Sequence, residues 1–348
     1  MTNHNRGHTL TGLFRGFRGA RWLAVLGGIL VLGFVFGQLS PAFLQIRNLQ
    51  NIIVQAAATG VMAIGMTFVI MTAGIDISVG GILFLTLVIG TQISLQWGLE
   101  STPFLIYLIA ILLGGFMGLI NGLVINYVRI NPLITTLATL SVYRGLAIHI
   151  TKAKIIIPPE SARILGIGKI GEIPVPLLTA ILITILGVLI LKYTRFGRYA
   201  QAIGASQRSA YESDLPVKQV LIAVYAIAGL CAGLGGMILL GRVGAVQTDM
   251  GIGIEFTVIT AVVLGGTLLS GGRASMVGSL LGAIFLVMID NGLNLIHASA
   301  FIYDIVRGAV LIGAVLIDRA ASLDLLGHWL KPVNGKLDAP KGEMASLK

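Results

Sequence analysis

Runs of apolar residues long enough to cross a lipid bilayer recur along almost the whole of this sequence. A helix needs about 20 such residues to cross the roughly 30 Å of hydrocarbon in a membrane. Of the 348 residues, 56% are hydrophobic and only 11% are charged, whereas soluble domains carry about 25% charged residues. The sequence therefore predicts an all-α, polytopic membrane protein.

The apolar runs and the polar interruptions between them predict about ten membrane-spanning helices. These lie near 22–39, 49–72, 76–96, 103–128, 132–150, 174–191, 217–240, 255–270, 275–296 and 301–317. Three glycine pairs, in 118–122, 229–233 and 278–282, have the spacing at which transmembrane helices pack closely. Such spacing is also common by chance, so each pair is equally compatible with a helix contact and with coincidence.

The distribution of basic residues predicts the orientation. Ten crossings place both termini on one side, and sixteen Lys and Arg residues lie on that side against six on the other. Because short cytoplasmic segments carry the excess of positive charge, we expect a basic cytoplasmic tail at 1–21, a membrane domain at 22–318 and a cytoplasmic tail at 319–348. Topology thus explains the net charge of +10 without a nucleic-acid partner.

Motifs of nucleotide, metal and catalytic sites are absent or lack their context. The stretch GIGKIG (166–171) matches a dinucleotide-binding pattern, but no strand precedes it, and the sequence contains no phosphate-binding loop motif. The five His residues are scattered, and Cys231 is alone inside an apolar run. The sequence therefore predicts no catalytic residue, no metal site and no cofactor held by this chain.

Ionisable side chains in or beside the apolar runs are candidate functional residues, because a charge within a bilayer is costly and usually faces a pathway or a partner. They are Asp76, Arg144, Glu255, Asp290, Asp304 and Arg307. Asp304 and Arg307 are three residues apart and could pair with each other. Asp76 lies in MTAGIDISVGG (71–81), where two interpretations are open. Either Asp76 or Ser78 caps the helix that begins there, or the two side chains line a polar route.

A second glycine-rich interruption, at 262–282, suggests that the chain has two related halves. The fragment with Asn121 followed by Arg144 resembles the fragment with Asn291 followed by Arg307. In the ten-span order the matching helices are five apart, so they would run in opposite directions. The pattern predicts an inverted repeat.

The longest interior segment between two predicted spans, 192–218, mixes basic and small residues. It could form a short amphipathic helix, then Gly204, then a second turn that ends at Pro216. This segment is either the contact site of an ATPase or a solvated linker whose basic residues set the topology. The exterior segment 151–173 is also basic, and it either shields the mouth of the pore or meets acidic groups of a binding protein.

Four blocks of the sequence resemble the membrane permease subunits of bacterial ribose/xylose-type sugar ABC transporters. They are AIGMTFVIMTAGIDISVGGI, NPLITTLATLSVYRGLAI, RFGRYAQAIGAS and IEFTVITAVVLGGTLLSGGRASMVGSLLGA, in an order kept from about 45 to 318. The resemblance implies a permease of the bacterial inner membrane that pairs with an identical or different permease subunit. It also implies a periplasmic sugar-binding protein outside and a separate ATPase inside, which would use ATP and Mg.

The expected path for the sugar is lined by Asp76, Ser78, Asn121, Glu255, Thr257, Asn291 and Asn294. The expected ATPase-coupling residues are Arg195, Arg198, Ala202, Gly204, Ser206 and Pro216. Thr257 stands where the family commonly has an acidic residue, which leaves the identity of the sugar open. The alternative function is a stand-alone secondary transporter or channel for a small polar solute, which would need no ATPase contact.

Overall fold

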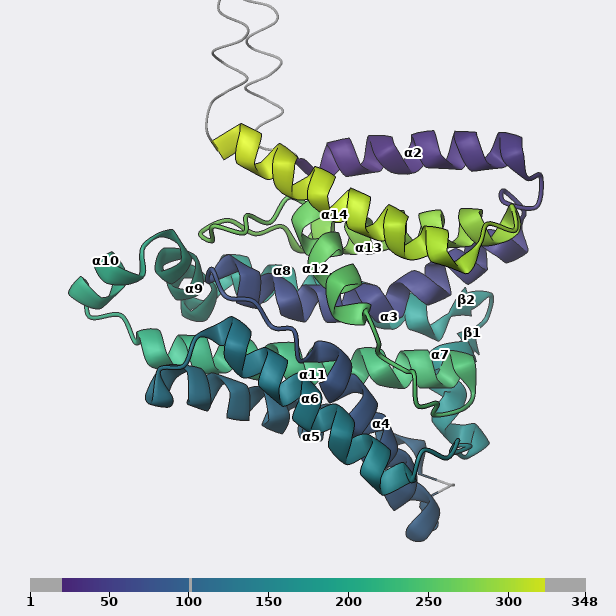
Figure 1. The fold of residues 1–348 in the computed structure, drawn as a ribbon, viewed down its shortest axis with the longest axis horizontal. Coiled ribbons are helices and arrows are strands. Elements are labelled where there is room, and N and C mark those ends of the chain that lie inside the picture. Colours follow the sequence, from purple (N-terminus) through teal and green to yellow (C-terminus); the bar gives the residue numbers. More distant parts are fainter. Residues whose placement is uncertain (1–20, 100–101, 323–348) are drawn as a thin grey trace, which may run out of the picture.

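The computed structural model describes residues 21–99 and 102–322 (Figure 1). The predicted tails therefore lie almost entirely outside the described residues. Helices make up most of the described chain, and its only strands are β1 (Lys169–Ile170) and β2 (Ile173–Pro174), which form an antiparallel hairpin. The prediction of an all-α, polytopic protein is confirmed.

Eight helices of the described chain are long and apolar enough to cross a membrane. They are α2 (Arg21–Leu39), α3 (Ile46–Met71), α4 (Val79–Gln96), α5 (Pro103–Leu123), α6 (Pro132–Thr151), α8 (Val175–Tyr193), α11 (Val217–Val243) and α13 (Met276–Leu295). The π-helical turn η2 (Val124–Val128) extends α5, and α14 (Ala300–Ser322) follows α13. Each of these helices overlaps a predicted span.

The predicted crossing at 255–270 is wrong as a continuous helix. α12 (Ile254–Leu264) has only 11 residues, which span about 16 Å at 1.5 Å per residue. It ends at Gly265, which packs backbone to backbone against Gly278 in α13. The next residue, Gly266, has a φ of +94°, a conformation that glycine adopts without steric cost. Apolar length alone could not reveal these two glycine constraints.

The stretch around α12 still connects the two ends of the bundle. At one end Val246 pairs with Ile156 in an isolated β-bridge. At the other end the amide of Gly272 donates to the carbonyl of Met71 over 2.9 Å. A short helix with irregular flanks therefore replaces one full-length helix. The order of crossings behind the orientation prediction is unchanged.

Glycines allow α11 to approach its neighbours closely in the middle of the bundle, where α3 and α5 pack against it (Figure 1). Gly114 and Gly229 lie so close that a Cβ on either would overlap the backbone of the other helix. Small residues permit such contacts between transmembrane helices. The glycine pairs in 118–122 and 229–233 join α5 to α11, and the pair in 278–282 packs against α12. All three spacings are therefore helix contacts.

The helix contacts repeat between the two halves of the chain. In order, α3, α4, α5 and α6 correspond to α11, α12, α13 and α14. The contact of α5 with α11 in the first set corresponds to that of α13 with α3 in the second. The contact of α4 with α6 likewise corresponds to that of α12 with α14. Arg242 donates to Gln55 over 3.1 Å and Gly65 packs on Ala228, so α3 and α11 are antiparallel. These relations agree with an inverted repeat.

Short elements cover the two ends of the bundle. At one end lie η3 (Glu160–Arg163), α7 (Ile164–Ile167) and the β1–β2 hairpin, and at the other lie α9 (Arg195–Ala205) and α10 (Gln207–Glu212) (Figure 1). The stretch GIGKIG runs from α7 into the hairpin and forms no strand–helix unit. Its match to a dinucleotide-binding pattern is therefore a coincidence.

Candidate functional site

A buried chain of hydrogen bonds joins three of the predicted path residues at the start of α4. The carboxylate Oδ1 of Asp76 accepts from the backbone amide of Ser78 at 2.9 Å and from its hydroxyl at 2.6 Å. The same hydroxyl accepts from the Asn121 side-chain amide at 2.7 Å. Because Asn121 belongs to α5, this chain of bonds ties the segment before α4 to a neighbouring span.

The burial of these residues bears on both interpretations of Asp76. Asp76, Ser78 and Asn121 are each 0% exposed, so they line no open route in this conformation. Ser78 is the N-cap residue of α4, but its side chain makes no capping hydrogen bond. Asp76 instead binds Ser78 itself. The three side chains hold the break between α3 and α4 in shape.

An arginine holds the second break, between α11 and α12. The guanidinium group of Arg144, on α6, donates to the carbonyl of Thr248 at 2.6 Å and to that of Met250 at 3.2 Å. It also lies 5.4 Å from the centre of the Phe84 ring on α4. Arginine has several donors in a planar fork, which suits two carbonyl acceptors at once. Arg144 thus fixes the segment that leads into α12.

Two further predicted path residues lie at the start of α12. The hydroxyl of Thr257 donates to the Gly253 carbonyl at 3.3 Å, so its hydrogen is used within the helix. The Oε2 of Glu255 has no hydrogen-bond partner among the described residues. The neighbouring Ile252 and Phe256 are 65% and 53% exposed. Glu255 itself is only 6% exposed, so its Oε2 is a buried acceptor with unused hydrogen-bonding capacity.

The two breaks meet at Gly80 and Gly251. A Cβ on Gly80 would overlap the carbonyl oxygen of Gly251 and lie 2.7 Å from Glu255 Oε2. The starts of α4 and α12, whose free amides carry partial positive charge, therefore lie close together inside the bundle. We call residues 76–80 and 248–257 the central junction. Helix ends that meet within the bundle form solute sites in many transporters.

The last two predicted path residues lie away from the central junction, on α13. Asn291 and Asn48 exchange two amide hydrogen bonds of 2.8 and 3.0 Å, which join α13 to the beginning of α3. Asn294 is exposed one turn further along. The structure thus brings five of the seven predicted path residues together and places these two elsewhere.

Arg307 has a different main partner from the one that its local sequence suggests. It pairs with Asp290 of α13 over 2.7 Å. Asp304, on its own helix, lies 3.8 Å away and is 88% exposed. The pair with Asp290 joins α13 to α14, whereas the pair with Asp304 lies at the surface.

The coupling segment, residues 192–218, forms α9 and α10. The helix breaks at Ser206, where φ is −162°, and not at Gly204, which lies within α9. A Cβ on Gly204 would overlap the carbonyl oxygen of Met71 and lie 2.6 Å from the amide nitrogen of Gly272. Gly204 therefore allows α9 to pack closely against Met71, at the end of α3, and against Gly272, in the segment that follows α12.

The other predicted coupling residues form an outer surface. Arg195, Arg198, Ala202, Ser206 and Pro216 are all exposed. The buried residues of α9 face the membrane helices on its opposite side. The coupling segment therefore combines an exposed basic face with a face packed on the broken crossings.

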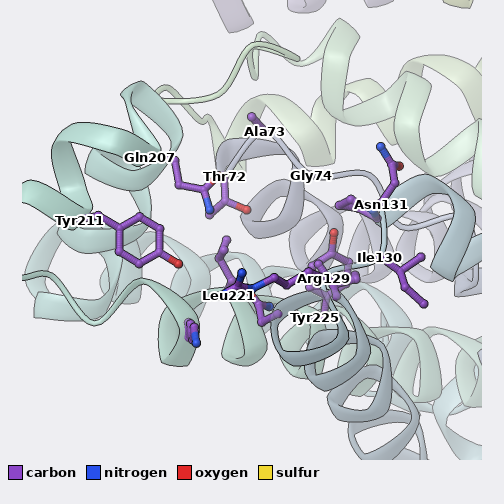
Figure 2. A pocket seen from close by; sticks show the side chains of 14 residues that line it. Thr72, Ala73, Gly74, Arg129, Ile130, Asn131, Gln207, Tyr211, Leu221 and Tyr225 are labelled. Carbon is purple, nitrogen blue, oxygen red and sulfur yellow. The ribbon is translucent and has the colours of Figure 1, made fainter.

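A cavity of about 510 Å³ lies between the coupling segment and the membrane helices (Figure 2). Its wall is formed by Thr72, Ala73, Gly74, Ile125, Asn126, Arg129, Ile130, Asn131, Pro132, Gln207, Tyr211, Lys218, Leu221 and Tyr225. Two of these residues are cationic and none carries a carboxylate. The sequence did not predict this cavity, because its residues come from four separate parts of the chain.

Sequence reasoning also missed partners that are far apart in the chain. Arg144 and Thr248 are separated by 104 residues, and Asn48 and Asn291 by 243. One signal was available, because Arg144 and Arg307 follow similar Asn-Gly fragments in the two halves.

Among the described residues, no group of three or more His, Cys, Asp or Glu is arranged to hold a metal ion.

Comparison with known proteins identifies the family. The family described as "Branched-chain amino acid transport system / permease component" matches residues 48–315. The ribose import permease protein RbsC of Bacillus subtilis is 40% identical over 300 residues, which cover 85% of this chain and 92% of that protein. No solved structure matches the chain.

Two relatives from Escherichia coli (strain K12) show similar coverage. Its ribose import permease protein RbsC is 36% identical over 296 residues, which cover 84% of this chain and 91% of that protein. Its D-allose transport system permease protein AlsC is 34% identical over 292 residues, which cover 83% of this chain and 88% of that protein. The family match includes both breaks of the central junction and the whole coupling segment. The chain therefore belongs to the family of branched-chain amino acid transport system permease components.

Proposed function

We propose that this chain is the membrane permease subunit of an ATP-driven importer and forms the path by which a small sugar crosses the membrane. The observation that carries the proposal is the 40% identity with a ribose import permease over 85% of the chain. Other relatives are named as permeases for D-allose and L-arabinose. These full-length relatives favour a sugar over the branched-chain amino acids of the family description.

The central junction supplies suitable chemistry for a sugar path. Carboxylates and guanidinium groups bind hydroxyls, and an exposed aromatic ring can stack on the apolar face of a sugar. Glu255 supplies a carboxylate that is buried, at 6% exposure, and whose Oε2 has no partner among the described residues, and Phe256 supplies an exposed ring beside it. Asp76, Ser78 and Asn121 support the junction from behind. Asn291 and Asn294 lie elsewhere, and their part in the path stays a prediction.

The partners follow from the same proposal. A separate ATPase, which binds ATP and Mg, docks on the exposed face of α9 and α10. A second permease subunit, identical or different, completes the path, and a periplasmic binding protein delivers the sugar. The assembly lies in the bacterial inner membrane with both termini of this chain in the cytoplasm.

Reconstitution with radiolabelled ribose tests the function. The chain, its matching ATPase and its matching binding protein are placed in proteoliposomes, with xylose, allose and leucine as competitors. ATP-dependent uptake that sugars reduce and leucine does not is the expected result. ATP-dependent uptake of radiolabelled leucine in a parallel assay, with none of ribose, would assign the chain to amino-acid import.

The stand-alone transporter is tested in the same vesicles without the ATPase and binding protein. We expect no accumulation there, with or without a proton or sodium gradient. Gradient-driven uptake by this chain alone would replace the ATP-driven importer with a secondary transporter.

A further inference from the structure

We propose that the cavity beside the coupling segment binds a phosphate group carried on a polyol, such as a sugar phosphate, and that its occupancy slows import. This inference goes beyond the proposed function, and its placement on the cytoplasmic side rests on the proposed orientation. Four observations support it: the charge of the wall, a buried hydroxyl without a partner, further polar groups around it, and the elements that the cavity joins.

The charge of the wall favours an anion. Arg129 ends the η2 turn in a left-handed conformation with a φ of +63°, and Lys218 lies in the first turn of α11. Both line the cavity, whose wall contains no carboxylate. Among the described residues neither forms an ion pair. Lys218 lies over an aromatic face, with its Nζ 5.3 Å from the centre of the Tyr127 ring. Two cations from different elements are suited to one phosphate group.

Tyr225 supplies the observation that points to a ligand. Its side chain is 1% exposed and its hydroxyl has no hydrogen-bond partner among the described residues. Tyr225 nevertheless lines the cavity, below the loop that contains Gly74 (Figure 2). A buried hydroxyl is normally hydrogen-bonded, so a polar ligand in the cavity would satisfy a group that the protein leaves unpaired.

Uncharged polar groups surround the rest of the cavity. Asn131 uses its Oδ1 to accept from the Leu133 amide at 2.9 Å, which leaves its side-chain NH₂ as a donor. Gln207 and Tyr211 of α10 add further donors and acceptors. These groups are suited to the hydroxyls of a polyol. A cavity of about 510 Å³ lies within the roughly 300–1,000 Å³ range of small-molecule sites.

The cavity joins parts that must move relative to one another in a coupled transporter. Gln207 and Tyr211 belong to the coupling segment, whereas Arg129 and Tyr225 belong to the membrane helices. A ligand held by both groups would restrain α10 against the bundle. Phosphoryl transfer from ATP to the imported sugar is the reaction class that would supply such a ligand. Occupancy of the cavity would therefore rise with the amount of sugar phosphate inside the cell.

Binding is measured with the purified full-length permease in phosphatidylcholine nanodiscs, without the ATPase. Ribose 5-phosphate is titrated by calorimetry, with inorganic phosphate and ribose as comparison probes. We expect saturable binding of ribose 5-phosphate, competition by inorganic phosphate and no binding of ribose. Arg129→Gln or Lys218→Gln should weaken binding more than about tenfold, because hydrogen bonds to charged groups are the strong ones. Tyr225→Phe should weaken it by roughly fivefold.

Matched substitutions outside the cavity serve as controls. Arg273→Gln and Lys192→Gln each remove one exposed cation and should leave the affinity unchanged. Tyr225→Phe is the safest variant for folding, because the hydroxyl that it removes has no partner. It keeps the test decisive if either charge variant fails to fold.

A second set of nanodiscs, with phosphatidylglycerol, separates two sources of the same chemistry. One outcome is that the parent no longer binds ribose 5-phosphate in these discs and retains phosphatidylglycerol, whereas Arg129→Gln does not retain this lipid. That outcome assigns the site to a lipid headgroup. Binding in both sets of discs assigns it to a soluble sugar phosphate. In proteoliposomes that contain the ATPase, ribose 5-phosphate inside the vesicles should slow uptake by the parent, and Tyr225→Phe should need a roughly fivefold higher concentration for the same effect.

Three results would overturn the proposal: no binding of either phosphate source, equal binding of ribose, or parental affinity in folded Arg129→Gln and Lys218→Gln variants. Unchanged uptake with the cavity filled would remove the control of import. The binding assay contains no ATPase and no transport step, so its failure leaves the proposed import function intact. Failure of sugar import would likewise leave the binding result standing.

Discussion

Asn121 and Ser78 are 43 residues apart in the chain, yet the Asn121 side-chain amide donates to the Ser78 hydroxyl over 2.7 Å. Both residues are fully buried. The same hydroxyl donates to Asp76 over 2.6 Å. This relationship attaches the break before α4 to α5 through one oxygen of the Asp76 carboxylate, whereas the other oxygen, Oδ2, has no hydrogen-bond partner among the described residues.

Substitution of Asp76 separates support from a path role. The side-chain carbonyl of an asparagine at this position could accept the same two bonds from Ser78, so Asp76→Asn should fold and import at close to the parental rate. Asp76→Ala should lower stability, because each buried polar group left unpaired costs about 1–3 kcal/mol. The measurements are uptake per folded complex and thermal unfolding in detergent. Asp304→Asn, at an 88% exposed site, is the control. A folded Asp76→Asn complex that does not import would indicate that the Asp76 carboxylate lines the path of the sugar.

Arg144→Met should loosen the segment before α12, because it removes the donors to the carbonyls of Thr248 and Met250. Each hydrogen bond to a charged group contributes about 1.5–3 kcal/mol. We expect faster hydrogen exchange in residues 244–253 together with reduced uptake. Arg273→Met, which removes an exposed arginine, should change neither. Unaltered exchange in Arg144→Met would show that the segment is held by other contacts.

Gly204→Ala should displace α9 from the membrane helices, because the new Cβ would overlap the carbonyl oxygen of Met71. Overpacking of this kind costs about 1–3 kcal/mol. The larger side chain of Gly204→Trp should reduce both co-purification of the ATPase and transport. Gly145→Ala is the matched control, since no atom lies within 4 Å of the position of its Cβ. Normal transport by Gly204→Trp would support the interpretation of the coupling segment as a linker.

The orientation is tested by labelling single cysteines in intact cells. Glu172→Cys, in the β1–β2 hairpin, should react with an impermeant maleimide from outside. Ser209→Cys, on α10, should react only after the membrane is opened. Both positions are exposed, whereas the native Cys231 is buried and should give little background. Tags at Met1 and Lys348 should resist protease in spheroplasts. Cleavage of one tag alone would contradict the predicted even number of crossings, and cleavage of both tags would contradict the predicted orientation.

The sequence by itself determined the membrane class and the positions of most helices. Long apolar runs have few alternatives to a helix within a bilayer, because every backbone amide and carbonyl there needs a partner within the protein. The predicted spans at 22–39 and 132–150 accordingly match α2 and α6 within one residue at each end. The glycine spacing also indicated that α5 and α11 make close contacts.

Only the tertiary structure decided how the helix breaks are used. α12 is short because Gly265 meets Gly278, and that contact depends on how α12 and α13 pack. Asp76 is joined to α5 because the Asn121 side chain donates to the Ser78 hydroxyl, which in turn donates to Asp76. A charged residue in an apolar run indicates that a partner must exist, since an unpaired buried charge is costly. Which partner it finds depends on helix packing, and neighbouring sequence carries no direct record of those distant contacts.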